Sequence, residues 1–546
     1  MIKRDKVVYQ IYPKSFKDSN GDGLGDIRGM IEKLDYLQDL GVDYIWSTPF
    51  FVSPQNDNGY DVADYYNIDS RYGTMEDVEE LISEAKKRNI GLMFDMVFNH
   101  TSTEHEWFKK ALAGDEKYQN YYIFKDGTLD KVQKNWTSKF GGSAWEYIPH
   151  LKKWYLHLFD KTQADLNWDN PEVRDELKKV ILFWKEKGVV GYRFDVVNLI
   201  SKPATFEDDD IGDGRRFYTD GPNVHEYLKE LVKDTGMEDM MTVGEMSSTS
   251  LENCVRYSNP DEGDLAMVFN FHHLKVDYKN GDKWTLQAPD YKQLKNLFKT
   301  WQLGIQEGNG LNAMFLCNHD QPRAISRFGN DTKYWKESAE MLATLIHMMQ
   351  GIPYIYQGEE LGMTNHGYTT IEQYRDVESL NYYKILMERG MTSDEALHVL
   401  NERSRDNGRT PMQWNSDTYA GFSTVEPWIP LPENYKTINA ESEFHDETSI
   451  YNYYKKLIQI RKNHRAISYG SISFIDNEDD EVIVYVRECE EERIVVIVNL
   501  VEDKKELILH ENLDLASKII SNYDSNEVNG NILSLKPYEC LVIKTR

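Results

Sequence analysis

The chain has 546 residues, of which 40% are hydrophobic, and its 63 Lys and Arg against 91 Asp and Glu give a formal charge of -28. This composition is typical of a globular protein with a large core and excludes a disordered, collagen-like or coiled-coil chain. The negative charge opposes binding to nucleic acid and to anionic membranes, so we expect neither partner. The sequence has no apolar run of about 18 residues and no signal peptide, and its four cysteines are scattered, which together indicate a soluble cytoplasmic protein.

Short apolar runs alternate with helical patterns through most of the chain. Eight of these runs have the length and composition of buried strands; they cover residues 7–12, 42–46, 91–98, 189–197, 241–245, 267–271, 313–317 and 353–356. Strands that alternate with helices form parallel sheets, and eight such units close into a barrel. The sequence therefore predicts an α/β fold built on a (β/α)₈ TIM barrel.

Two regions depart from this alternation and predict additional domains. Residues 101–168 are rich in aromatic, Gly and polar residues and are too long for a simple loop, so we expect a small subdomain inserted after strand three. The barrel itself is expected in residues 1–100 and 169–465, with a second long insertion over residues 362–449. Residues 466–546 read as short strands joined by charged turns, which predicts a C-terminal antiparallel β-sandwich.

Acidic and imidazole side chains lie at four predicted strand ends, where a TIM barrel carries its reactive groups. The third strand leads to His100, the fourth to Asp195, the fifth to Glu245 and the seventh to His319 and Asp320. Burying one such group in an ion pair is common, but gathering all of them at one barrel mouth costs desolvation free energy unless they serve a reaction. We therefore predict the active site here.

Hydrolysis of a glycoside needs one carboxylic acid that is protonated and one that is ionised. Asp195 follows Arg193 by two residues, and a neighbouring guanidinium favours the ionised form that a nucleophile requires. Glu245 has no cation beside it in the sequence, so the charges of Asp195 and Asp320 would keep it protonated as the general acid and base. Asp320 would stabilise the oxocarbenium charge. Hydrogen bonds to sugar hydroxyls are expected from His100 and His319.

Four segments resemble, in order and spacing, the hallmark regions of the α-amylase superfamily, the family 13 glycoside hydrolases. They are residues 95–100, 191–195, 244–245 and 318–320. The resemblance implies a retaining double displacement on α-glucosides, with Asp195 as nucleophile, Glu245 as acid and base and Asp320 as transition-state stabiliser. It also implies the barrel, the inserted subdomain and the C-terminal β-domain, and it implies no organic cofactor.

Within the superfamily, residues 55–61 and 409–414 are similar to the exo-acting oligo-1,6-glucosidase branch. The resemblance implies that Asp57 and Arg409 close the end of the pocket and hold the hydroxyls of a terminal glucose, while Tyr60 stacks on its ring. Such a pocket releases one glucose at a time. Val196, directly after the nucleophile, resembles the α-1,6-acting members more than the α-1,4-specific ones.

Residues 18–26 place oxygen-bearing side chains at alternate positions, as calcium loops do. The segment begins like an EF-hand, but position twelve is Gly29 where a bidentate Glu would be required, so it is not one. Related glucosidases bind a structural Ca²⁺ in a similar loop; the alternative is a solvated turn of Asp and Gly. The matching ligands here are Asp18, Asn20, Asp22, the carbonyl of Leu24 and Asp26.

Residues 269–284, with residues 8–16 and 214–220, resemble the members of this branch that hydrolyse trehalose 6-phosphate. A phosphate needs charge-assisted hydrogen bonds, for which the candidates are His272, Lys275 and Lys283. Asp277 and Asp282 lie among these residues, so a solvated charged loop is the alternative. We expect a retaining α-glucosidase that cleaves trehalose 6-phosphate, a small sugar phosphate, to glucose and glucose 6-phosphate.

Three other functions fit parts of the sequence. An oligo-1,6-glucosidase would act on neutral isomaltose-type sugars, and a barrel of this ancestry can also lose catalysis and become an interaction subunit. The intact Asp195, Glu245 and Asp320 argue against the inactive barrel. A metallohydrolase using His100 and His319 lacks a close pair of ligands at metal spacing. The sequence leaves the oligomeric state open.

Overall fold

The computed structural model describes residues 3–130, 134–509 and 517–546. Its central sheet contains β1 (Val8–Ile11), β2 (Tyr44–Ser47), β5 (Gly91–Met96), β11 (Gly191–Phe194), β12 (Met241–Glu245), β13 (Met267–Phe269), β14 (Ala313–Met314) and β15 (Ile352–Tyr356). These strands are parallel and follow the order β13-β12-β11-β5-β2-β1-β15-β14. A parallel bridge between Val268 and Asn312 joins the two ends of the sheet. The predicted TIM barrel is confirmed, with all eight expected strands in place.

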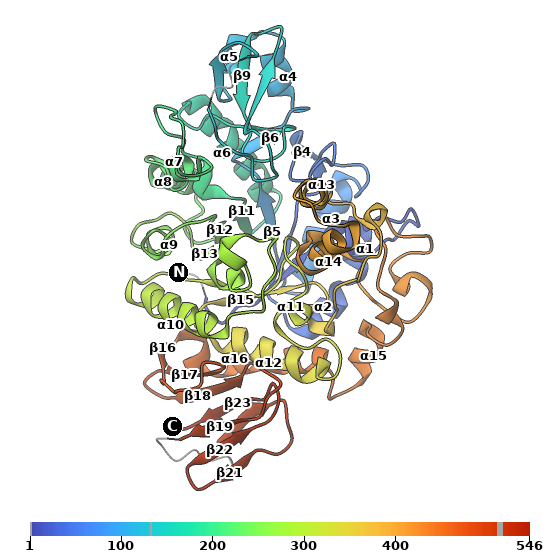
Figure 1. Ribbon diagram of the computed structural model, residues 1–546, viewed down its shortest axis with the longest axis vertical. Helices are drawn as coiled ribbons and strands as arrows, with labels where there is room; N and C mark the ends of the chain where they lie inside the picture. The colour runs from blue at the N-terminus through green and yellow to red at the C-terminus, as the bar shows by residue number, and fades with distance from the viewer. Residues whose placement is uncertain (1–2, 131–133, 510–516) are drawn as a thin grey trace.

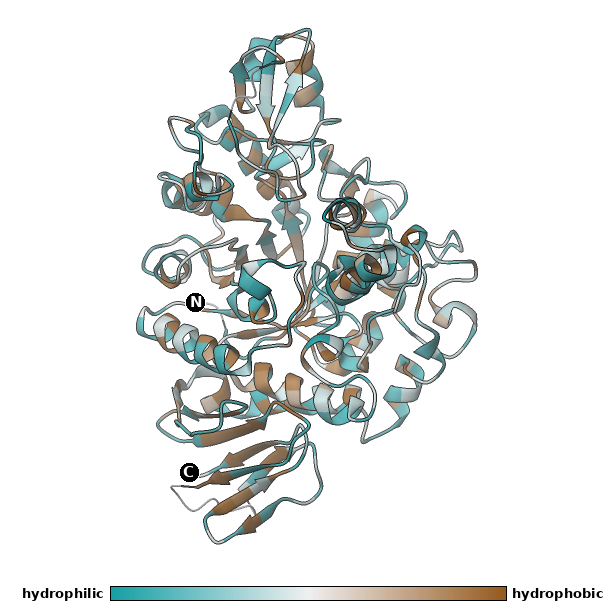
Figure 2. Ribbon diagram, in the orientation of Figure 1, coloured by the Kyte–Doolittle hydropathy of each residue, from teal (hydrophilic) through white to brown (hydrophobic). Residues whose placement is uncertain are grey.

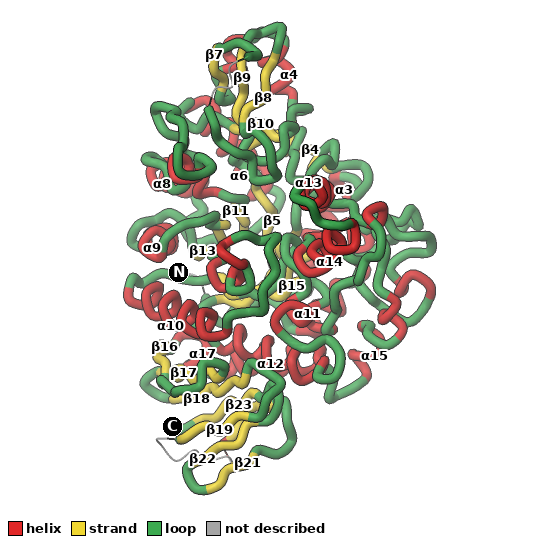
Figure 3. Tube along the Cα trace, in the orientation of Figure 1, coloured by secondary structure: helices red, strands yellow, loops and turns green. Residues whose placement is uncertain are grey.

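Helices surround this sheet, as the red and yellow segments of Figure 3 show. Helix α6 illustrates why they form: Asn170 caps its first turn, Pro171 occupies the first helical position, and Leu177, Ile181 and Trp184 lie on its buried face. All helices of the barrel part of the chain bury apolar side chains. They are α1 (Ile27–Glu32), α2 (Leu34–Leu40), α3 (Met75–Lys87), α6 (Pro171–Glu186), α7 (Arg215–Tyr218), α8 (Val224–Thr235), α9 (Leu251–Ser258), α10 (Tyr291–Glu307), α11 (Ala324–Phe328), α12 (Trp335–Met348), α16 (Ile450–Asn463) and α17 (Arg465–Tyr469).

The segment after β5 leaves the barrel and forms the uppermost part of the molecule in Figure 1. Its elements are β6 (His100–Ser102), α4 (Glu106–Leu112), α5 (Glu116–Gln119), β7 (Phe124–Asp126), β8 (Trp145–Ile148), β9 (Lys153–Leu156) and β10 (Gln163–Asp165). Strands β6 and β10 pair antiparallel, and β7, β9 and β8 form a separate sheet. Residues 131–133 of the expected subdomain lie outside the described residues.

Two further groups of elements complete the catalytic part of the chain. A two-stranded sheet follows β2 and contains β3 (Phe51–Val52) and β4 (Asp64–Ile68). The insertion after β15 contains α13 (Val377–Glu388), α14 (Ser393–Arg403) and α15 (Ala440–His445). Leu386 and Leu400 of this insertion pack with Trp284 from the loop after β13 in a separate small core, so the insertion is anchored beside the barrel mouth.

The C-terminal domain consists of two antiparallel sheets. Its strands are β16 (Ser471–Phe474), β17 (Val482–Glu488), β18 (Arg493–Asn499), β19 (Lys505–Ile508), β20 (Lys518–Ser521), β21 (Glu527–Asn529), β22 (Ile532–Leu535) and β23 (Cys540–Lys544). Side chains alternate along β17, because Val484 and Val486 pack between the two sheets while Ile483 and Tyr485 pack against the barrel core. Figure 2 shows these strands as largely hydrophobic. The predicted sandwich is confirmed; residues 510–516 lie outside the described residues.

No helix within the described residues has the length and apolar character needed to cross a membrane.

Candidate active site

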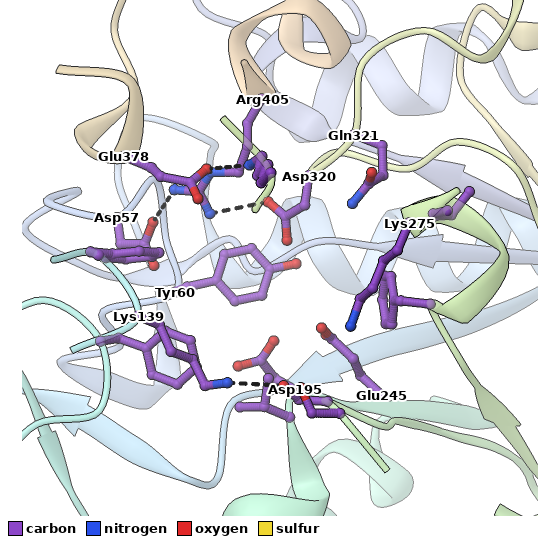
Figure 4. A pocket seen from close by; sticks show the side chains of 18 of the residues that line it. Asp57, Tyr60, Lys139, Asp195, Glu245, Lys275, Asp320, Gln321, Glu378 and Arg405 are labelled. Atoms are coloured by element: carbon purple, nitrogen blue, oxygen red, sulfur yellow. Dashed lines mark hydrogen bonds and ion pairs between the residues drawn. The ribbon is translucent and has the colours of Figure 1, made fainter. Parts of the chain in front are cut away.

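A pocket of about 240 Å³ opens at the carboxyl ends of the barrel strands. Its wall combines side chains of the barrel loops with side chains of the inserted subdomain, as Figure 4 shows. Six of the predicted catalytic and sugar-binding residues line it: Asp57, Tyr60, His100, Asp195, Glu245 and Asp320. The sequence positions of these residues are far apart, so the barrel topology brings them together.

Arg193 organises the carboxylates on one side of the pocket. Its side chain on β11 is 1% exposed, and its Nη1 donates to Asp195 Oδ1 at 2.7 Å and to Asp95 Oδ1 at 2.8 Å. Its Nη2 donates to Glu245 Oε2. The sequence has no cation next to Glu245, but the fold supplies one, so Glu245 and Asp195 share a single guanidinium.

The backbone turns sharply directly after Asp195. Val196 has φ 36° and ψ 40°, a left-handed conformation that β-branched residues rarely adopt. Its side chain packs with Trp136, Leu199 and Tyr218 in the core of the inserted subdomain. This packing fixes the position at which Asp195 leaves the strand.

Asp320 is held by two arginines and an imidazole. Its Oδ1 lies 2.8 Å from Arg409 Nη2 and 3.2 Å from Arg405 Nη1, and its Oδ2 lies 3.2 Å from His319 Nε2. Burial opposes ionisation, but the charges of His319 and Arg405 outweigh it and place the pKa of Asp320 well below its usual range. Asp320 is therefore a fixed negative charge in the pocket.

Asp57 closes the far end of the pocket with Arg405. Asp57 Oδ1 accepts from Arg405 Nη2 at 3.2 Å, and its Oδ2 accepts from Gln163 at 2.9 Å. Arg409 was also expected to close this end of the pocket, but it contacts Asp320 and Asp376 and does not line the pocket. Arg405 lies there in its place. Burial raises the pKa of Asp57 to about 7, although Arg405 acts in the opposite direction.

The two histidines, His100 and His319, are buried. Burial lowers the pKa of both His100 and His319. His100 Nε2 lies 3.1 Å from the carbonyl of Tyr60 and 3.2 Å from Gln163 Nε2, whereas His319 Nδ1 lies 2.7 Å from Gln10 Nε2. The Tyr60 ring stacks on His319 with 5.1 Å between centroids and 4° between planes. Tyr60 and His100 therefore line the pocket, whereas His319 lies behind Tyr60 and does not line it.

The three candidate phosphate residues differ in their surroundings. Lys275 lines the pocket, and no carboxylate among the described residues lies within 4.0 Å of it. Lys283 also lines the pocket, but its Nζ pairs with Glu378 at 2.7 Å. His272 does not line the pocket, because its Nε2 lies 2.8 Å from the Thr249 carbonyl and its ring stacks on Trp301. The structure therefore corrects the expected position of His272.

Three residues that line the pocket or hold its wall in place were not identified from the sequence. Arg405 lies four residues before Arg409, so the motif at residues 409–414 could have indicated it. Gln163 is at the start of β10 and reaches both Asp57 and His100. Lys139 lies in the inserted subdomain and lines the pocket. No local pattern marks Gln163 or Lys139, because their role depends on how the subdomain folds back over the barrel.

The expected calcium loop is a closed turn. Asp18 Oδ1 accepts from the backbone N–H groups of Asn20 and Gly21, and Asp26 Oδ1 accepts from that of Gly29. A Cβ at Gly29 would lie 2.0 Å from the Lys17 carbonyl, so this position has no room for the Glu of an EF-hand. Within the described residues, no group of three or more His, Cys, Asp or Glu is arranged to hold a metal ion. A Ca²⁺ ion in the loop of residues 18–26 would therefore also need the Asn20 amide and the Leu24 carbonyl as ligands.

Comparison with sequence families finds two matches along the chain. Residues 10–470 match the family described as "Alpha amylase, catalytic domain", and residues 482–542 match "Alpha-amylase SusG C-terminal domain". The first match covers the barrel with both insertions, and the second covers the β-sandwich.

Individual relatives match over nearly their full lengths. The chain is 51% identical to the trehalose-6-phosphate hydrolase of Bacillus subtilis, covering 98% of this chain and 97% of that protein. It is 46% identical to the oligo-1,6-glucosidase of Parageobacillus thermoglucosidasius, covering 100% and 99%. The crystal structure of Bacillus licheniformis trehalose-6-phosphate hydrolase superposes with a TM-score of 0.94 and 52% identity, covering 99% of each chain.

Proposed function

The chain belongs to the alpha-amylase family, and on that basis we propose that it is a retaining, exo-acting α-glucosidase that hydrolyses trehalose 6-phosphate to glucose and glucose 6-phosphate. The relatives that are 51% identical and named trehalose-6-phosphate hydrolases support this substrate. The single structural observation that carries it is Lys275, a cation without a carboxylate partner among the described residues, in a pocket that also contains Asp57, Asp195, Glu245 and Asp320.

In the first half of the reaction, the Asp195 carboxylate attacks the anomeric carbon of the unphosphorylated glucose. Glu245 donates its proton to the bridging oxygen, and glucose 6-phosphate leaves. Retaining enzymes keep their two carboxyl groups about 5 Å apart, and a shared contact to Arg193 holds Asp195 and Glu245 close together. The product of this step is a glucosyl ester on Asp195.

In the second half, Glu245 takes a proton from water, and the resulting hydroxide attacks the anomeric carbon and releases Asp195. The contact between Arg193 Nη2 and Glu245 Oε2 holds this carboxyl group in position for both proton transfers. The fixed charge of Asp320 stabilises the oxocarbenium character of both transition states. Two inversions at the anomeric carbon give overall retention.

The closed end of the pocket explains exo action. Asp57 and Arg405 would hold hydroxyls of the terminal glucose, Tyr60 would stack on its ring, and His100 would hydrogen-bond to it. Arg409 acts behind this wall by orienting Asp320. The second glucose would lie beyond Glu245, toward the loop that carries Lys275, where its phosphate meets positive charge.

Two further properties belong to this proposal. A Ca²⁺ ion bound by Asp18, Asn20, Asp22, the Leu24 carbonyl and Asp26 would stabilise the first barrel loop; the alternating oxygens support this, and Asp18 and Asp26 are both buried. We place the enzyme in the cytoplasm, because all four cysteines are free and three of them are buried.

The test is a comparison of kcat/KM on trehalose 6-phosphate, trehalose and isomaltose. We expect trehalose 6-phosphate to be preferred by at least about tenfold, the effect of one charge-assisted hydrogen bond to phosphate. The relatives named oligo-1,6-glucosidase make neutral isomaltose-type sugars the second candidate. A preference for isomaltose would assign that function instead.

A further inference from the structure

Four Lys or Arg side chains of the described residues line the pocket: Lys139, Lys275, Lys283 and Arg405. Two of them are neutralised within the free protein. Arg405 pairs with Asp57, Asp320 and Asp376, and Lys283 pairs with Glu378. Lys139 and Lys275 have no carboxylate of the described residues within 4.0 Å. These two lysines are therefore positive charges that the pocket holds without a partner.

The two lysines come from different parts of the fold. Lys275 ends the short helix η3 (His272–Lys275), which follows β13, whereas Lys139 belongs to the inserted subdomain. Lys139 Nζ donates to Ser247 Oγ at 2.9 Å and lies 5.9 Å from the ring centroids of Phe159 and Tyr218. Figure 4 shows both side chains reaching into the pocket, Lys139 from the subdomain and Lys275 from the opposite wall.

The Ser247 hydroxyl accepts a hydrogen bond from Lys139 beside the proposed acid. Ser247 lies two residues after the proposed acid Glu245 and also lines the pocket. Its backbone is fixed by Asn198, which accepts from the Ser247 N–H and donates to the Ser247 carbonyl, each at 2.9 Å. Lys139 therefore points at the region that the departing sugar would occupy.

The environment of Lys139 disfavours its charge. Burial, followed by the positive charges of Arg215 and Lys275, lowers the pKa of Lys139 to about 7, although Asp213 and Asp165 act in the opposite direction. A dianion bound between Lys139 and Lys275 would favour the charged form of Lys139.

We propose that Lys139 binds the phosphate of the substrate together with Lys275, so that the inserted subdomain and the loop after β13 hold the phosphate from two sides. This inference rests on the proposed function and extends it to a residue outside the segment that the sequence indicated. Lys139 would exchange its Ser247 contact for the phosphate oxygens. It is a specificity residue for the phosphorylated sugar, and it takes no part in bond cleavage.

The test measures Lys139→Met and Lys139→Arg on trehalose 6-phosphate and on p-nitrophenyl α-glucoside, which carries no phosphate. We expect Lys139→Met to raise KM for trehalose 6-phosphate at least about tenfold while kcat, and all constants for the aryl glucoside, change less than about threefold. Lys139→Arg should restore most of the affinity. Lys153→Met removes a charge from the same subdomain away from the pocket, where Lys153 contacts Gln119, and should change neither substrate.

A pH profile gives a second readout. In the unaltered enzyme, the ratio of kcat/KM for the two substrates should fall above about pH 7, as Lys139 loses its proton. The Lys139→Arg variant should keep this ratio constant, because a guanidinium stays charged.

Three outcomes would overturn the inference. If the unaltered enzyme prefers trehalose 6-phosphate and Lys139→Met keeps that preference, the function stands but Lys139 does not bind phosphate. If Lys139→Met loses activity equally on both substrates and Lys139→Arg does not restore it, Lys139 serves the structure. If the unaltered enzyme shows no preference for the phosphorylated sugar, the proposed function fails, and this inference fails with it.

Discussion

Replacing Lys275 with methionine removes a pocket cation that has no carboxylate partner among the described residues. A charge-assisted hydrogen bond to phosphate contributes about 1.5 to 3 kcal/mol, and each 1.36 kcal/mol is about tenfold in rate. Because Lys275 is exposed to water in the pocket, the lower half of this range applies. We expect kcat/KM for trehalose 6-phosphate to fall about 10- to 50-fold, and that for p-nitrophenyl α-glucoside to change less than about threefold.

Lys283 provides the contrasting case, because its charge is already neutralised by Glu378 at 2.7 Å. Lys283→Met should weaken trehalose 6-phosphate binding by leaving the negative charge of Glu378 facing the phosphate. The double variant Lys283→Met with Glu378→Gln removes both charges and should recover most of the loss. The assay is kcat/KM for both substrates on all four proteins of the cycle. An effect below threefold for Lys275→Met, or a double variant as poor as Lys283→Met, would refute this reasoning.

Three other predictions concern the reaction, the metal loop and pH. Glu245→Gln should accumulate a glucosyl adduct on Asp195 from an aryl glucoside with a good leaving group, and Asp195→Asn should form none; mass spectrometry that locates the sugar elsewhere would contradict the assigned roles. If the loop of Asp18 and Asp26 binds Ca²⁺, a chelator should lower the melting temperature without stopping turnover at low temperature; an unchanged melting temperature with no metal by elemental analysis would contradict it. The pKa of Asp57 is about 7 in the folded protein and about 4 in the unfolded chain. The free energy of unfolding therefore falls by up to about 4 kcal/mol as the pH rises from about 4 to about 7. The Asp57→Asn variant should therefore melt at a higher temperature than the unaltered protein at pH 8, and this difference should be smaller at pH 5. Its activity on every α-glucoside should fall. Equal melting temperatures of the two proteins at pH 8 would show that the ionised Asp57 does not destabilise the fold.

Local patterns in the sequence were sufficient for the barrel and for the positions of Asp195, Glu245 and Asp320 along it. Strand and helix periodicity involves neighbouring residues, and alternation of the two imposes a parallel sheet whose carboxyl ends meet at one face. A polar residue that directly follows a buried strand must therefore lie at this face, whatever the loops around it do. The β-sandwich was predicted from short strand-like runs joined by charged turns, a pattern that also involves only neighbouring residues.

The tertiary structure decided the partners of these side chains. Arg405 meets Asp57 across 348 positions of sequence, and Lys139 meets Ser247 across 108. Both contacts depend on irregular loops, which have no periodic pattern from which a direction can be predicted. The basic residues of residues 269–284 looked equivalent in the sequence, yet His272 turns to Trp301, Lys283 to Glu378 and Lys275 into the pocket. The distances between side chains decide which charges remain available to a substrate. These distances are set only when the subdomain, the barrel and the insertion after β15 pack together.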